Sequence, residues 1–265
     1  MNIFLKELRS HRKSLIFWSI GVLLMVVSGM AKYDAYSSSG QSINDLVADL
    51  PKSLRAVLGF SAVDLSKVDG YYALLFIYLL LMATIHAAML GATIIAKEER
   101  DKTTEFLFSK PVSRTTVISA KLAAAFVNIL IINIFTYISS IISIGNYDTD
   151  VVINRSIGLL MVGMLLLQTL FMVIGSALAS VKRKPGTASS VATGILLLTY
   201  MMAIAIDLNE KMENLKYVTP FKYVEAKNVL FGSGLEARFV LLSLVLIVAL
   251  TIVTYHFFEK RDLNA

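Results

Sequence analysis

Residues 71–96 read YYALLFIYLLLMATIHAAMLGATIIA, a run that contains no Asp, Glu, Lys or Arg. About 20 consecutive apolar residues suffice for a helix to cross the roughly 30 Å hydrocarbon core of a bilayer. The rest of the chain has the same character, because 56% of its 265 residues are hydrophobic and 17% are charged. Soluble domains contain about 25% charged residues. The sequence therefore predicts a polytopic membrane protein.

Six stretches are long and apolar enough to span a membrane. We expect one all-α transmembrane domain over residues 1–265, with spans at about residues 15–31, 71–96, 116–144, 156–181, 188–206 and 239–258. The first stretch follows basic residues, as the apolar part of a signal peptide does. Five further spans follow it without a convincing small-residue cleavage site, which favours a retained anchor.

The distribution of Lys and Arg predicts the orientation, because these residues are enriched in short cytoplasmic segments. If both termini are cytoplasmic, 14 of them fall in four short inner segments, at 6–13, 97–114, 182–184 and 260–261. The outer segments, at about 32–70, 145–155 and 207–238, hold 10 over far longer stretches. The density of basic residues therefore places both termini in the cytoplasm.

Three segments outside the spans have patterns of their own. The first outer segment carries a helical apolar stripe that Pro51 interrupts, which predicts two short amphipathic helices on the outer surface. The segment around 220–223 mixes aromatics with lysine and could be interfacial or re-entrant. Ile3, Phe4 and Leu8 lie among basic residues and predict an amphipathic N-terminal helix along the inner leaflet.

Few polar residues interrupt the spans. The six spans contain no Asp or Glu. This absence disfavours an ion-driven carrier and an intramembrane hydrolase, since both need ionisable groups inside the spans. We expect His86 to be satisfied by neighbouring helices rather than to contact substrate. We expect Lys121 to snorkel to the inner surface. Amide side chains should supply interhelical hydrogen bonds; they are Asn128, Asn133 and Gln168.

Small residues recur at four-residue spacing in two of the spans. Such rows let helix backbones approach closely, either within one subunit or between two. We expect helix packing at Ala83, Ala87, Gly91, Gly175 and Ala179.

Several classes of chemistry are excluded by composition. The chain has no cysteine, and its three histidines are too far apart in sequence to form a spaced metal-ligand pair. No glycine is followed by lysine, so the chain has no P-loop. We therefore expect no catalytic, cofactor-binding or metal-ligating residue. The net charge of +6 fits the inner face of a membrane rather than a nucleic-acid partner.

The most informative hydrophilic segment is residues 97–121, KEERDKTTEFLFSKPVSRTTVISAK. Asp101 or Thr103 can cap a short helix, which Pro111 ends. Ser113 can cap the next span, and Arg114 lies at phosphate level. The sequence Phe-Leu-Phe at 106–108 places apolar groups in an aqueous loop. They either contact a protein partner or dip into the bilayer.

This segment resembles the cytoplasmic coupling segment of type-2 permeases of ATP-binding-cassette (ABC) transporters. The resemblance rests on Glu98-Glu99-Arg100, Thr104-Glu105-Phe106-Leu107, Pro111-Val112-Ser113-Arg114 and Lys121. Six spans, cytoplasmic termini and a basic amphipathic start are also similar to that family. The chain departs from it at Lys102-Thr103, where many relatives place a glycine before the threonine.

The resemblance implies a type-2 ABC exporter-like fold with a coupling helix between spans 2 and 3. It further implies a plasma-membrane protein of prokaryotic type, which pairs with a second permease copy or paralogue. Each half would dock one cytoplasmic ABC ATPase subunit, two per complex, and these would bind the ATP and Mg. The implied contacts with the ATPase are Glu98, Glu99, Arg100, Thr104, Glu105, Phe106, Leu107 and Phe108. The residues implied to shape the turn into span 3 are Pro111, Ser113 and Arg114.

The resemblance favours export of an amphipathic substrate, such as a drug, antimicrobial peptide, lipid or glycan intermediate. An alternative is a non-transporting membrane scaffold or immunity protein that holds a cytoplasmic partner through the same loop.

Overall fold

The computed structural model describes residues 2–38, 43–60, 63–103, 112–147, 151–181, 187–232 and 234–260. Over these ranges the chain is helical, and six helices are long and apolar enough to cross a membrane. They are α1 (Ile3–Ser38), α4 (Val68–Arg100), α6 (Arg114–Ile144), α7 (Val151–Val181), α8 (Ala188–Leu208) and α10 (Ala237–Lys260). Each contains one predicted span, so the prediction of six membrane-spanning helices is confirmed.

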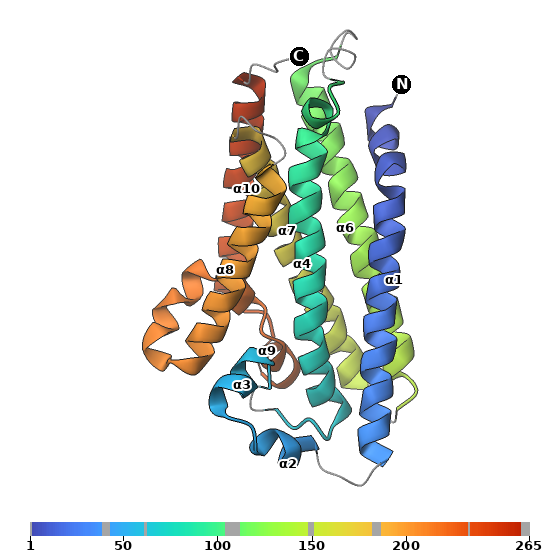
Figure 1. Ribbon diagram of the computed structural model, residues 1–265, viewed down its shortest axis with the longest axis vertical. Coiled ribbons are helices and arrows are strands. Elements are labelled where there is room, and N and C mark those ends of the chain that lie inside the picture. The colour runs from blue at the N-terminus through green and yellow to red at the C-terminus, as the bar shows by residue number, and fades with distance from the viewer. Residues whose placement is uncertain are drawn as a thin grey trace.

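The long helices form a bundle around α4 and α7, which make the most extensive helix–helix contact (Figure 1). Helix α1 packs against α6 and α4, α10 packs against α7, and α8 packs against α4. The apolar sequence of α4 is explained by this position, because most of its length is surrounded by other helices. Many side chains of α1, α8 and α10 instead remain exposed apolar groups.

The two ends of the bundle differ in what they carry. The start of α1, the end of α4, the start of α6 and the end of α10 lie together at one end (Figure 1). Contacts between Lys97 and Glu7 and between Arg114 and Glu259 fix this arrangement. We call it the terminal end of the bundle. The opposite end carries the short elements α2 (Ile43–Ala48), α3 (Lys52–Val57), η2 (Glu210–Val218), η3 (Pro220–Tyr223) and α9 (Ala226–Phe231).

The start of the chain differs from the prediction. An amphipathic helix along the inner leaflet was expected before the first span, but residues 3–38 form one continuous helix. The sequence has no proline before Pro51 and no glycine before Gly21, so nothing in the first five turns breaks the helix. An ion pair between Glu7 and Lys97 also holds these turns alongside α4.

The segment before the last span folds back onto the bundle. Two of its aromatic side chains are buried: Phe221 lies beside Phe171 and Tyr200, and Tyr223 stacks on Phe239 at 5.0 Å between ring centroids. In the first outer segment, α2 and α3 are separated at Pro51. The prediction of two short helices there is confirmed.

Candidate functional site

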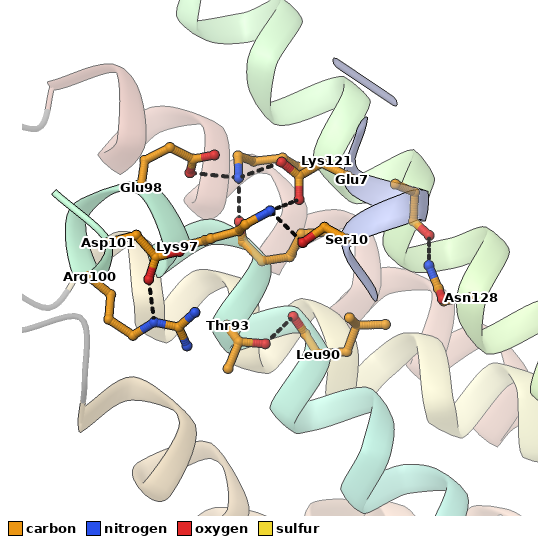
Figure 2. A network of polar contacts seen from close by, with 12 residues as sticks. Glu7, Ser10, Leu90, Thr93, Lys97, Glu98, Arg100, Asp101, Lys121 and Asn128 are labelled. Atoms are coloured by element: carbon orange, nitrogen blue, oxygen red, sulfur yellow. Dashed lines mark hydrogen bonds and ion pairs between the residues drawn. The ribbon is translucent and has the colours of Figure 1, made fainter. Parts of the chain in front are cut away.

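Four ionisable side chains meet inside the terminal end of the bundle, where α1, α4 and α6 come together (Figure 2). We call them the ion-pair cluster. Helix α1 supplies Glu7, α4 supplies Lys97 and Glu98, and α6 supplies Lys121. A charge removed from water needs an opposite charge or hydrogen bonds close by. The short distances within the cluster meet that need.

Lys121 occupies the centre of the cluster and is completely buried. Its Nζ lies 2.7 Å from a carboxylate oxygen of Glu98 and 3.7 Å from one of Glu7. It also donates a hydrogen bond of 2.6 Å to the backbone carbonyl of Ile94. The expectation that Lys121 snorkels to the inner surface is therefore wrong. Two carboxylates and a carbonyl inside the bundle replace the water that snorkelling would reach.

Lys97 connects the cluster to the first helix. Its Nζ donates to Glu7 at 3.1 Å and to the hydroxyl of Ser10 at 2.8 Å. Glu7 of α1 accepts a hydrogen bond from Lys97 of α4 and lies near Lys121 of α6. The three helices are therefore joined by charge as well as by packing (Figure 2).

Helix α4 ends directly beside the cluster in a Schellman turn. The backbone N–H of Thr103 donates to the carbonyl of Glu98 at 2.8 Å, and that of Lys102 donates to Glu99. Lys102 has φ +53°, in the left-handed region that glycine adopts most readily. Glycine would adopt this conformation at a lower cost than lysine. Arg100 Nε donates to Asp101 at 3.0 Å at the exposed surface of the turn.

The centre of the predicted coupling helix lies outside the described residues. Residues 104–111 belong to it, so the structure gives no account of Thr104, Glu105, Phe106, Leu107, Phe108 and Pro111.

The return of the chain into α6 begins at Ser113. Its hydroxyl accepts a 3.1 Å hydrogen bond from the N–H of Thr116, so it caps the helix. Arg114 donates to the backbone carbonyl of Glu259 at 2.7 Å and so connects the start of α6 to the end of α10. Both ends of the hydrophilic segment are therefore attached to the bundle.

Comparison with known proteins places this sequence in a family. The model of the family described as "ABC-2 family transporter protein" matches residues 1–263. The chain belongs to this family. It is an ABC-2 type permease and a multi-pass membrane protein. No curated protein matches the sequence.

The permease's two central helices, α4 and α7, cross at Gly91 and Gly175. A Cβ at Gly91 would overlap the carbonyl oxygen of Met172, and one at Gly175 would overlap that of Ala88. Ser176 spans the same crossing and donates to the carbonyl of Gly91 at 3.1 Å. Other small residues of the two rows are also buried; they are Ala83, Ala87 and Ala179. The rows thus lie between α4 and α7 of one chain.

The polar side chains within the permease's spans have three different surroundings. Asn133 donates to Gln168 and to the carbonyl of Met161, and so links α6 to α7 as expected. Asn128 instead donates to the carbonyl of Ala124 in its own helix, and it forms no interhelical bond with the residues that the structure describes. His86 lies against Trp18 of α1, 5.3 Å between ring centroids. Its Nδ1 is buried and has no hydrogen-bond partner within the described ranges, which contradicts the expectation of a satisfied histidine.

Glu7 is a member of the cluster that the sequence pattern did not indicate as a site residue. It is the one acidic residue among the basic residues of 6–13, and it is 1% exposed. That lone acid, next to a basic helix start, is the signal that could have suggested a partner among the lysines of neighbouring helices.

Proposed function

We propose that this permease is the membrane-spanning subunit of an ABC exporter in a prokaryotic plasma membrane, with both termini in the cytoplasm. Two separate cytoplasmic ATPase subunits hydrolyse ATP with Mg, and a second permease copy or paralogue completes the pathway. The substrate is amphipathic: a drug, an antimicrobial peptide, a lipid or a glycan intermediate. The chain's own contribution is to receive the movement of the ATPase and pass it to the spans.

The observation that carries this proposal is the position of the ion-pair cluster. Glu98 precedes the hydrophilic loop and Lys121 follows it, and their side chains meet in a buried pair at 2.7 Å. Glu7 adds α1 to the same unit. A partner that pushes or pulls the loop therefore acts on three helices that move together, because separating them would leave charges unpaired inside the bundle.

The residues around the loop divide into two roles in this proposal. Arg100 is exposed and Glu99 is partly exposed at the end of α4, so both can reach a protein docked beneath the bundle. Together with Thr104, Glu105 and the apolar residues at 106–108, they would form the contact with the ATPase. The carboxylate of Glu98 faces Lys121 instead, so we assign Glu98 to positioning the loop. Pro111, Ser113 and Arg114 would hold the return into α6.

The outer faces of α1, α8 and α10 supply surface for the other partners. They expose large apolar side chains along the bundle; examples are Ile16, Phe17, Leu24, Leu197, Leu198, Met201, Leu241 and Ile252. Lipid and a second permease would cover these faces, since water would not solvate them favourably.

Affinity purification from the native membrane in mild detergent tests the proposal. A stoichiometric P-loop ATPase in the eluate, together with ATP-dependent efflux by the complex, is the expected result. Phe106→Ala should abolish ATPase recovery and leave a folded, membrane-inserted permease, because a buried aromatic anchor contributes about 2 kcal/mol or more to binding. Phe257→Ala is the matched control, since Phe257 is an exposed aromatic on α10.

Two outcomes would contradict the proposal. Recovery of the permease without any ATPase, in more than one detergent, would favour the scaffold alternative. Recovery of an ATPase whose hydrolysis drives no efflux would identify a membrane anchor or immunity protein rather than an exporter.

A further inference from the structure

A groove of about 280 Å³ runs between α1 and α4 at the terminal end of the bundle. Polar side chains line its walls, although the two helices are mainly apolar along the rest of their length. Helix α1 contributes Ser10, His11, Ser14 and Trp18, and α4 contributes His86, Met89, Leu90, Thr93, Lys97 and Arg100. Among the described residues assigned to the ATPase contact, Arg100 also lines this groove.

Two imidazole nitrogens in this groove lack hydrogen-bond partners. The Nδ1 of His86 and the Nε2 of His11 are both buried and unpaired among the described residues. His86 is only 3% exposed, so bulk water does not solvate its ring. A buried polar atom without a partner costs free energy. The presence of two such atoms in one groove points to a ligand that supplies oxygen atoms there.

The groove changes in character along its length. The two helices are antiparallel, and Lys97 and Arg100 lie at the terminal end, whereas His86 and Trp18 lie deeper. With a rise of 1.5 Å per residue, His86 is roughly 16 Å along the helix from Lys97. Charge at one end and aromatic and apolar surface at the other match an amphipathic ligand that lies along the helices.

The two cationic side chains at the open end, Lys97 and Arg100, still have N–H donors available to hydrogen-bond such a ligand. Lys97 uses two of its three N–H donors on Glu7 and Ser10. The guanidinium of Arg100 donates through Nε to Asp101, which uses one of its five N–H donors. The neighbouring segment 6–13 carries four basic residues and one acidic residue, so the surroundings favour a net negative headgroup.

We propose that the α1–α4 groove is a binding site for a membrane lipid with a net negative phosphate headgroup. The phosphate lies among His11, Lys97 and Arg100, where charge-assisted hydrogen bonds are strongest. An ester or hydroxyl oxygen of the lipid pairs with His86, and the acyl chain lies along Trp18 and Met89. This site needs no ATPase, so it can be tested apart from the proposed function.

Trp18 makes the test direct, because it is the chain's single tryptophan and lines the groove. The purified permease is placed in phosphatidylcholine nanodiscs with increasing amounts of phosphatidylglycerol that carries brominated acyl chains. Bromine quenches tryptophan fluorescence on contact. Phosphatidylcholine with the same brominated chains measures quenching by lipid that only surrounds the protein. We expect brominated phosphatidylglycerol to reach half-maximal quenching at a mole fraction about tenfold lower than brominated phosphatidylcholine does.

Variants separate the site from the surroundings. The double variant His11→Phe/Arg100→Gln removes two of the three groups that hold the phosphate, and it should reduce the preference for phosphatidylglycerol to within about twofold. His256→Phe, at an exposed histidine of α10, should leave the preference unchanged. If the double variant does not give a monodisperse helical protein, the single variant Arg100→Gln, at an exposed residue, replaces it and should also reduce the preference.

Three results would overturn the proposal. Equal quenching by the two brominated lipids would show that no charged headgroup is selected. A preference that survives in both sets of variants would place the lipid elsewhere on α1. Displacement of the brominated phosphatidylglycerol by millimolar inorganic phosphate would show a site for free phosphate rather than for a lipid.

Discussion

The ammonium group of Lys121 lies 2.7 Å from a carboxylate oxygen of Glu98, and both side chains lie inside the terminal end of the bundle. One residue precedes the hydrophilic loop and the other follows it, so the pair closes the loop at its base. Glu7 lies 3.7 Å from the same ammonium group. The loop therefore joins the membrane domain at a point where three helices share buried charge.

Removal of the central cation should strongly destabilise the permease. In Lys121→Met, Glu98 and Glu7 lose a buried partner, and unpaired buried charges of this kind cost about 3–5 kcal/mol. Chemical unfolding of the purified protein in detergent, followed by helical circular dichroism, measures the difference. The double variant Lys121→Met/Glu98→Gln should recover part of the loss, because it removes the carboxylate that loses its ion-pair partner, whereas Glu7 keeps Lys97.

The exposed pair at the end of α4 provides the control for this prediction. Arg100→Gln removes the partner of Asp101, and both side chains of that pair are about half exposed. Exposed pairs contribute about 0–1 kcal/mol. A loss in Lys121→Met no larger than the loss in Arg100→Gln would contradict the role assigned to the cluster.

Much of the fold could be predicted because one physical signal dominates this sequence. Runs such as 71–96 are too long and too apolar for any other environment than a bilayer, so all six spans were found. Pro51 and Ser113 also act locally, and the helix break and the helix cap lie where the sequence indicates. Small residues at four-residue spacing indicated a close crossing, although the spacing does not show which helix comes close.

The unpredicted features all depend on which side chains meet across helices. Lys121 was expected to reach water, because the sequence does not show that Glu7 and Glu98 lie within reach. Asn128 bonds within its own helix, and His86 faces Trp18. These outcomes follow from the rotation of each helix about its axis, which hydrophobic periodicity alone fixes poorly when a helix is apolar on every side.

Substitution of the glycines at the α4–α7 crossing should separate the two central helices. The Cβ in Gly91→Ala would meet the backbone carbonyl of Met172, which has no flexible side chain to move aside. We expect a loss of about 1–3 kcal/mol or more, as for other overpacked cores. The measurement is the midpoint of thermal unfolding in detergent, compared with Gly194→Ala on α8, where a Cβ would meet nothing within 4 Å. That control should be neutral or stabilising by up to about 1 kcal/mol; equal midpoints for the two variants would contradict the crossing.

Lys102→Gly should stabilise the turn that ends α4. Lys102 has φ +53°, and a non-glycine residue in the left-handed region costs roughly 1–2 kcal/mol. The greater freedom of glycine in the unfolded chain offsets part of this gain, so we expect a net increase of about 0.5–1 kcal/mol in unfolding free energy. Asp101→Gly is the comparison, because Asp101 has φ −87° and gains nothing from glycine. Destabilisation by both substitutions would show that the turn does not need a left-handed residue.

At the opposite end of the bundle, Lys222 should give the permease a pH-dependent contribution to stability. Its Nζ lies 2.5 Å from Asp207 and 2.6 Å from Glu225. Burial alone would lower the pKa of Lys222, but the two carboxylates outweigh burial and raise the pKa above its ordinary value of 10.5. A raised pKa in the folded state means that the stabilisation is fully present below pH 10.5 and is lost as the pH rises through the folded-state pKa.

Lys222→Met should therefore cost about 1–2 kcal/mol at pH 8, because the carboxylates it leaves behind are partly exposed. The difference from the unsubstituted permease should shrink as the pH rises through the raised pKa. Lys227→Met is the matched control, since Lys227 is more exposed and lies 3.6 Å from Glu225. Unfolding midpoints of the three proteins at pH 8, 10 and 11 test the prediction. A difference for Lys222→Met that stays constant over that range would show that the lysine stabilises the segment by packing and not by its charge.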